Sequence, residues 1–165
     1  MATETESGST RYKLGIDGWI AGAGGGFVGG ILMGLVMQFV MPTQTLQLAI
    51  PAMYGIEGPA LGIGWALHQF HAVVLGVTYV ALVQFEPIRG PAKRVVPAIG
   101  LGIGYGVVTT FLLGAILMPV WLSAVGFAAM PPLPNVGIPQ TPLSLLAHVI
   151  YAIPVAVAYA ATGRT

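Results

Sequence analysis

Four long hydrophobic stretches, separated by polar or proline-broken segments, dominate this chain. A helix needs roughly 20 apolar residues to cross the hydrocarbon core of a bilayer. The stretches that meet this length cover about residues 19–41, 63–85, 95–118 and 143–161. Pro42 and Pro119 follow the first and third stretches, and we expect them to end those helices. The pattern predicts an all-α, polytopic four-helix membrane bundle over residues 14–165.

Composition agrees with a chain that lies in lipid. Of its 165 residues 56% are hydrophobic and only 7% are charged, against about 25% charged in a typical soluble domain. The net charge of +1 gives no basis for nucleic-acid binding. Since the sequence has no cysteine, disulfides and thiolate metal sites are excluded. The polar start, residues 1–13, lacks the apolar core of a signal peptide, and we expect a mobile cytoplasmic tail there.

The basic residues predict the orientation of the bundle. All six lie at the start of the chain, between the second and third stretches, or at the end. They are Arg11, Lys13, Arg89, Lys93, Arg94 and Arg164. Because basic loops stay inside the cell, both termini are predicted to be cytoplasmic, in a multi-pass protein of the plasma membrane. The other two segments, 42–62 and 119–142, are apolar and rich in proline, and they would lie in the outer interface or dock on a partner.

The two halves of the chain resemble each other. His68 precedes Tyr79 by eleven residues, as His148 precedes Tyr159, with an offset of eighty between the pairs. This indicates two parallel two-helix repeats, related by a pseudo-twofold axis along the bilayer normal. The two tyrosines fall near the predicted cytoplasmic interface, where tyrosine is typically an anchor in the headgroup region.

Glycines at a spacing of four support the same repeat. An offset of seventy-seven pairs Gly25 and Gly29 in the first stretch with Gly102 and Gly106 in the third. Small residues at this spacing let membrane helices approach closely. We therefore assign these four glycines to helix packing.

All three histidines, His68, His71 and His148, fall within predicted spans. An ionisable side chain in a span usually faces the bundle interior and marks a functional site. His68 and His71 share a helix face, and His148 is expected at the depth of His68. The second and fourth spans run parallel, so His68 and His148 could face each other near the outer leaflet.

Three interpretations of the histidines remain open. His68 and His148 could form a structural, hydrogen-bonded pair that joins the two halves. They could instead ligate the iron of haem b, or copper or zinc with Glu57, His71 or a methionine. In the third interpretation they contact a quinone headgroup, or relay protons beside a redox centre in a partner subunit.

No catalytic motif accompanies the histidines. The glycine-rich run Gly22–Gly30 lacks the Gly-Lys-Ser/Thr of a phosphate-binding loop, and no Ser, His and Asp constellation is evident. No lysine and no acidic residue lies in the middle of a predicted span. These absences point away from retinal binding and from a proton-coupled transporter.

Several short motifs resemble a known group of proteins. They are Gly64-Trp65-Ala66-Leu67-His68, Tyr79, Met118-Pro119, and Ser144-Leu145-Leu146-Ala147-His148-Val149-Ile150-Tyr151. Together they resemble small four-span prokaryotic membrane proteins of unknown function, common in haloarchaea, some labelled "histidine kinase". The resemblance implies the four-span architecture and no established activity. A kinase is not supported, because the chain has no cytoplasmic domain that could hold ATP.

The sequence thus leads to one main functional hypothesis and two alternatives. The main one is a non-catalytic accessory subunit of a larger respiratory or electron-transfer complex, of haem–copper oxidase or cytochrome b type. It would contact other integral membrane subunits and lipid. The first alternative is a stand-alone haem- or metal-binding protein that uses His68 and His148. The second is a small channel or transporter that assembles as a homo-oligomer.

Overall fold

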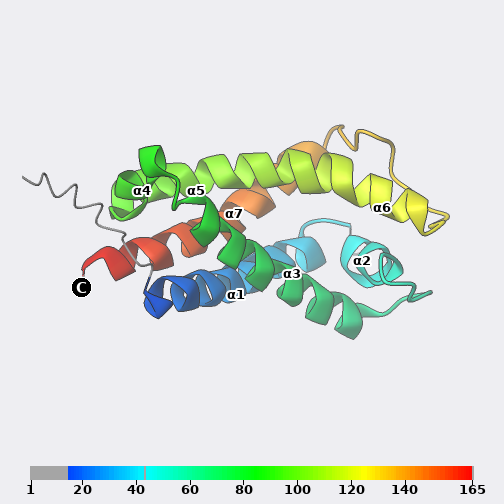
Figure 1. The fold of residues 1–165 in the computed structure, drawn as a ribbon. Helices are drawn as coiled ribbons and strands as arrows, with labels where there is room; N and C mark the ends of the chain where they lie inside the picture. Colours follow the sequence, from blue (N-terminus) through cyan, green and yellow to red (C-terminus); the bar gives the residue numbers. More distant parts are fainter. Residues whose placement is uncertain (1–14, 43, 165) are drawn as a thin grey trace, which may run out of the picture.

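The computed structural model describes residues 15–42 and 44–164, and this part contains four helices long and apolar enough to span a membrane. They are α1 (Ile16–Phe39), α3 (Leu61–Leu82), α5 with its continuation (Val95–Ala124), and α7 (Gln140–Ala161). They form one elongated bundle (Figure 1). No strand occurs in the described residues. The predicted all-α four-helix membrane architecture is confirmed, while the predicted tail, residues 1–13, lies outside the described part.

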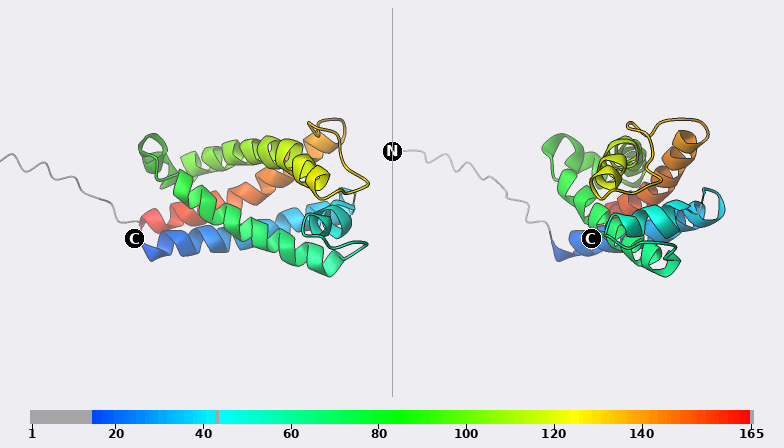
Figure 2. Two further views of the ribbon diagram at one scale, coloured as in Figure 1. Left: turned by 45° about the vertical axis from the view of Figure 1, so that its right-hand side comes forward. Right: turned by 90° about the vertical axis from the view of Figure 1, so that its right-hand side faces the viewer.

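Three short elements, η1 (Thr45–Ala49), α2 (Ile50–Ala52) and α4 (Glu86–Ala92), connect the spanning helices at the ends of the bundle. Elements η2 (Thr110–Leu117) and α6 (Met118–Ala124) continue α5, and η3 (Thr162–Arg164) follows α7. The start of α1, the end of α7 and α4 lie together at what we call the basic end (Figure 1; Figure 2). Elements α2 and α6 lie at the opposite, distal end.

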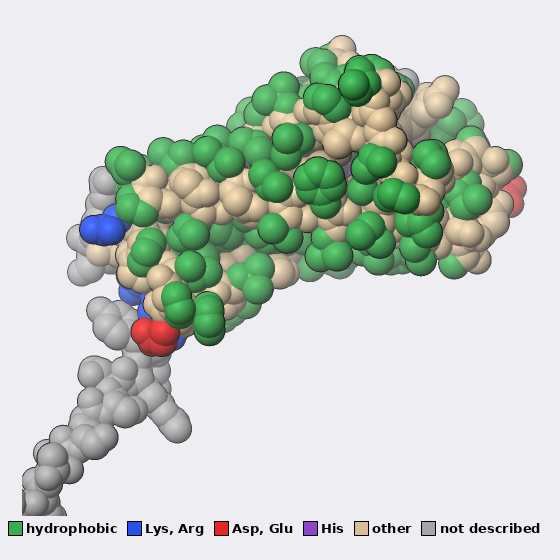
Figure 3. Space-filling view, turned by 90° about the horizontal axis from the view of Figure 1, so that it is seen from above, with side chains coloured by type: hydrophobic (Ala, Val, Ile, Leu, Met, Phe, Trp, Pro, Cys, Tyr) green, Lys and Arg blue, Asp and Glu red, His purple; other side chains and the backbone are tan. Residues whose placement is uncertain are grey.

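The surface separates charge from apolar side chains along the bundle axis. On the face drawn in Figure 3, hydrophobic side chains cover the length of the bundle, and charged ones appear only toward its two ends. This distribution is the one that a bilayer around the bundle requires. Which end faces the cytoplasm stays a prediction.

The third helix continues past Pro119, where the sequence predicted that it would end. It passes from α5 through the π-helical η2 into α6 and runs for 30 residues, to Ala124. Proline has no N–H to give to the carbonyl four residues earlier, that of Ala115. The backbone N–H of Asn135, in the distal loop, donates to this carbonyl at 2.8 Å. The loop therefore satisfies the group that Pro119 leaves free, and the helix continues.

Glycines bring α1 into backbone contact with α3. A Cβ atom added at Gly22 would lie 2.9 Å from the carbonyl oxygen of Gly76, and one at Gly26 would lie 2.5 Å from that of Ala72. Real Cβ atoms do not approach this closely, so only glycine allows this separation of the helices. Close backbone approach is how helices associate in lipid.

A second glycine face of α1 contacts α7 in the same way. A Cβ atom at Gly25 would lie 2.8 Å from Cα of Val155, and one at Gly29 would lie 2.2 Å from the carbonyl oxygen of Tyr151. Helix α1 therefore packs along both α3 and α7. It packs on its own hairpin partner, α3, and it also connects the first hairpin to the second through α7.

Helix α5 has only one such face, and it also meets α7. Cβ atoms at Gly102 and Gly106 would lie 3.0 Å from Cβ of Ala156 and 2.8 Å from Cα of Val149. Toward α3, α5 instead presents Tyr105, whose hydroxyl donates to the carbonyl of Leu75 at 2.8 Å. The interface between α5 and α3 thus contains an aromatic side chain, whereas the interface between α1 and α7 contains glycines and allows backbone contact. The packed order is therefore α3, α1, α7, α5.

This order corrects the glycine equivalence expected from the repeat. Gly25 and Gly29 contact the opposite hairpin, whereas Gly102 and Gly106 contact their own hairpin partner. The glycines of α1 that face its own partner lie on the neighbouring row, at Gly22 and Gly26. A strict twofold would also make α3 pack on α5 as closely as α1 packs on α7, but α3 and α5 pack much less closely. The duplication itself stays a prediction.

We expect Gly29→Ala to destabilise the bundle by about 1–3 kcal/mol, because the new methyl group overpacks the contact with Tyr151. Gly24→Ala is the matched control, since it lies on the same helix and a Cβ there meets nothing within 4 Å. Unfolding in mixed micelles with increasing denaturing detergent measures both. Equal stability of the two variants would contradict the backbone contact.

Candidate functional site

A cavity of about 640 Å³ lies in the distal half of the bundle, where α3 and η2 face each other without close contact. Ligand pockets typically measure roughly 300–1,000 Å³. We call it the distal cavity. Most of its wall is apolar, and it includes five methionines. They are Met33, Met37, Met41, Met53 and Met118. All three histidines also line it.

The two distal segments fold over this cavity. The ring of Tyr54, after α2, packs at a tilt of 45° against that of Trp121 in α6, with 5.6 Å between ring centres. Leu46 and Leu122, one from each segment, are fully buried. The segments predicted at 42–62 and 119–142 therefore pack on the bundle and on each other.

His68 points from α3 toward α1. Its side chain is 5% exposed, and Nε2 donates to the backbone carbonyl of Gly30 at 2.9 Å. Its ring meets that of Trp65 edge-on, and Trp65 in turn donates to Gln38 at 2.7 Å. Because a carbonyl can only accept, the proton of the neutral imidazole is on Nε2, and Nδ1 is an acceptor.

His148 has the opposite arrangement. Its side chain is 9% exposed, and Nδ1 donates to the carbonyl of Ser144, one turn earlier in α7, at 2.8 Å. The hydroxyl oxygen of Ser144 lies 3.4 Å from the same nitrogen. Nε2 is therefore the unprotonated nitrogen of the neutral ring. The glycine face of η2, at Gly114, lies beside this ring.

His71 belongs to the distal cover rather than to the floor of the cavity. Its Nε2 is hydrogen-bonded to the hydroxyl of Tyr54 at 2.5 Å, and the two rings stack with centres 5.6 Å apart. His71 thus ties α3 to the segment that covers the cavity.

The structure brings His68 and His148 to one cavity but does not join them. Among the described residues no hydrogen bond links the two rings, and each donates to a backbone carbonyl instead. The structural pair considered from the sequence is not formed.

The same geometry limits the fit of haem and metal. A histidine that ligates through Nε2 typically donates Nδ1–H to a carbonyl, as His148 does, whereas His68 has its Nε2 committed to Gly30. Within the described residues, no three His, Asp or Glu side chains converge as metal ligands would. Glu57 is exposed and does not line the cavity. The residues present do not fit a bis-imidazole haem without breaking the bond to Gly30.

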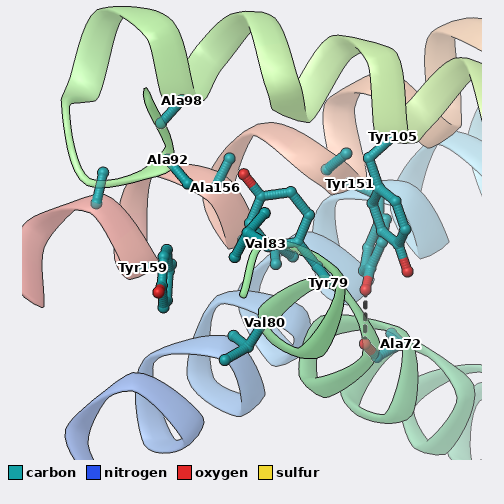
Figure 4. Close-up of a cluster of buried hydrophobic side chains, with 13 residues drawn as sticks. Ala72, Tyr79, Val80, Val83, Ala92, Ala98, Tyr105, Tyr151, Ala156 and Tyr159 are labelled. Atoms are coloured by element: carbon teal, nitrogen blue, oxygen red, sulfur yellow. Dashed lines mark hydrogen bonds between the residues drawn. The ribbon is translucent and has the colours of Figure 1, made fainter. Parts of the chain in front are cut away.

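Four tyrosines fill the bundle between the cavity and the basic end: Tyr79, Tyr105, Tyr151 and Tyr159 (Figure 4). Tyr151 donates to the carbonyl of Ala72 at 2.8 Å, and Tyr159 accepts a hydrogen bond from Gln84 at 3.0 Å. Tyr79 and Tyr159 are 2% and 0% exposed. The expectation that these two anchor the headgroup region is therefore wrong, because the small residues around them leave space in the core.

The sequence suggested a methionine only as a possible metal ligand, and it predicted neither the methionine-rich wall nor the contact between Tyr54 and Trp121. Met33, Met37 and Met41 recur at a spacing of four; the first two share a face of α1, and Met41 follows just after the helix ends. This spacing could have indicated a soft, apolar wall opposite the histidines. The contact of Tyr54 with Trp121 joins distant parts of the chain and had no local signal.

We expect Tyr151→Phe to lower the free energy of unfolding by about 0.5–1.5 kcal/mol, because the carbonyl of Ala72 loses a buried donor. Tyr79→Phe is the matched control, since its buried hydroxyl has no partner among the described residues, and we expect no loss of stability there. Thermal unfolding in detergent compares the two. A larger loss in Tyr79→Phe would contradict the hydrogen-bond assignment.

Comparison with known proteins returns no relative of this chain. No protein-family model, no curated protein and no solved structure matches it. The distal cavity and the residues around it are therefore the features from which a function can be inferred.

Proposed function

We propose that this protein is a non-catalytic membrane protein that holds a small, largely apolar ligand in the distal cavity. We further propose that it does so as an accessory subunit of a membrane electron-transfer complex. One observation carries the proposal: His68 and His148, from different hairpins, line a single cavity of about 640 Å³ whose wall is otherwise mainly apolar. A largely apolar pocket with a few polar groups is the usual form of a small-molecule site.

The size of the cavity supports a bound ligand over loose packing. Protein interiors are close-packed, with few voids larger than a water molecule. This bundle is packed to backbone contact along α1 and α7, yet it keeps a partly open cavity at one end. Tyr105 spaces α3 from α5, and the hydrogen bond between Asn135 and Ala115 secures the distal cover. The surrounding structure thus holds the space open.

The chemistry of the wall supports a binding role without catalysis. The residues that line the cavity, all within the described part of the chain, include no Asp, Glu, Lys or Arg. A ligand that dissolves in lipid and carries a small polar head, as quinones and related molecules do, matches this wall. Membrane electron-transfer complexes exchange such molecules, which favours a place beside one. With both termini in the cytoplasm of a plasma-membrane protein, the cavity would lie in the outer leaflet.

The two alternative functions have less support. A stand-alone haem protein would need His68 to release Gly30. A channel through a single bundle would need a path along its axis, but the tyrosine cluster fills the bundle on the basic-end side of the cavity (Figure 4); a pore between copies of the chain is tested by the purification experiment. Both alternatives remain outcomes of the experiments that follow.

Filling the cavity tests the binding role. Gly114 lines it, and a Cβ atom there would lie 3.4 Å from the hydroxyl oxygen of Ser144, an ordinary contact. We expect Gly114→Leu to lower at least tenfold the amount of apolar small molecule that solvent extraction and mass spectrometry recover from the purified protein. Gly104→Leu, on the same helix with open space around it, should retain the molecule. Extracts that hold only bulk phospholipid, in equal amount for both variants, would refute the proposal.

Purification in mild detergent tests the accessory role. We expect the 17.0 kDa chain to migrate with other integral subunits in a complex that absorbs in the Soret region. The absorption should persist when the chain carries His68→Ala, since the haem would belong to the partner. Migration alone, or only with further copies of itself, would remove the accessory role and leave the cavity's role intact. A Soret band that this variant abolishes would favour the stand-alone haem protein.

A further inference from the structure

The hydrogen bonds of the two buried histidines define which head group the distal cavity can accept. We propose that it selects an apolar molecule whose head is a hydroxyl that donates a hydrogen bond, of the quinol or alkylphenol class. The oxidised or methylated counterpart, which only accepts hydrogen bonds, is disfavoured. This inference rests on the proposed function, since it requires that the cavity holds an apolar ligand.

His148 supplies the first step of the argument. Its N–H is fixed on Nδ1 by the carbonyl of Ser144, so Nε2 carries a lone pair. That nitrogen makes no hydrogen bond within the described part of the chain, and the ring lines the cavity. An incoming hydroxyl can donate to it, whereas an incoming carbonyl leaves two acceptors facing each other.

His68 presents the same polarity from the other hairpin. Its N–H is fixed on Nε2 by the carbonyl of Gly30, so Nδ1 is the free acceptor. In both rings the single N–H is therefore donated to a carbonyl of a helix backbone. The other neutral tautomer of either ring would turn a nitrogen lone pair toward the carbonyl oxygen that now accepts its N–H, which places two acceptors against each other.

Two of the hydroxyl groups in the cavity wall already act as donors to the backbone. Thr110 donates to the carbonyl of Gly106 at 2.7 Å, and Tyr151 donates to that of Ala72 at 2.8 Å. The side-chain amides of Gln44 and Gln140 also line the cavity, but both residues are exposed at the distal rim. Ser144 and Asn135 also line the cavity with polar side chains, so the preference is assigned to the two imidazoles, each of which keeps an acceptor nitrogen and no free N–H.

The wall also fixes the charge state that this polarity requires. No carboxylate lines the cavity to pair with an imidazolium. An unpaired charge among apolar side chains in a membrane is costly. The neutral form, with one acceptor nitrogen on each ring, is the one that this wall accommodates.

A matched pair of probes tests the inference without redox chemistry. 4-Nonylphenol and 4-nonylanisole have the same chain and ring, and differ in that only the phenol has an O–H. Binding to the full-length protein in lipid nanodiscs can be followed through tryptophan fluorescence, because Trp121 lines the cavity. We expect the phenol to bind at least about tenfold more tightly than the ether, because the ether leaves the acceptor nitrogen unpaired.

Two variants assign the preference to the histidines. His148→Phe and His68→Phe keep an aromatic ring and remove its acceptor, so we expect the preference for the phenol to fall toward one in at least His148→Phe. Binding of the ether should persist there, which reports an intact cavity. Tyr79→Phe, a residue that is not among those lining the cavity, is the control and should keep the preference.

The possible failures are distinguishable. If neither probe binds the wild-type protein, the proposed function fails, and this inference fails with it. If phenol and ether bind equally, the cavity keeps its binding role and the hydroxyl selection is overturned. A preference that survives both histidine variants would overturn the assignment to these two rings.

Discussion

Backbone contact between α1 and its two neighbours is the constraint from which the rest of this bundle follows. In lipid, apolar side chains gain little by leaving one apolar environment for another, so helices associate through close packing. Helix α1 has glycines on two adjacent faces, and each face meets a different helix at a separation that a methyl group would prevent. The first hairpin and the second are thereby fixed to each other at α1 and α7.

The cavity lies where the helices no longer have glycines that allow backbone contact. Helix α5 has one glycine face, which α7 uses, and its next face carries Tyr105 toward α3. The phenol ring acts as a spacer near the middle of the bundle, and beyond it α3 and η2 diverge toward the distal end. The same few residues therefore explain both the tight half of the molecule and the open half. A site placed by packing in this way is rigid, because moving its walls means separating helix backbones.

How much the sequence could predict depends on whether the signal was local. The four spans followed from apolar length alone, which the bilayer imposes on each helix separately. The position of Pro119 within a continuous helix could not be predicted, because the donor that compensates for it is Asn135, in the following loop. The glycine spacing predicted close packing, but two adjacent rows on α1 share that spacing, so the partner of each row depends on the tertiary arrangement. The burial of Tyr79 and Tyr159 was missed for a similar reason, since an interfacial anchor and a core tyrosine look alike in sequence.

The histidines illustrate how a helix bundle can determine the chemistry of a site through its backbone. The depth of His68 and His148 in the spans could be inferred from their positions, but the nitrogen that each exposes could not, because it depends on which carbonyl accepts the ring proton. One carbonyl belongs to the neighbouring helix, and the other to the same helix one turn earlier. The outcome is the same in both hairpins: a proton held by the backbone and an acceptor left over. Because the other tautomer of each ring would set a nitrogen lone pair against a carbonyl oxygen, the polarity of the cavity follows from where the backbone places these two carbonyls.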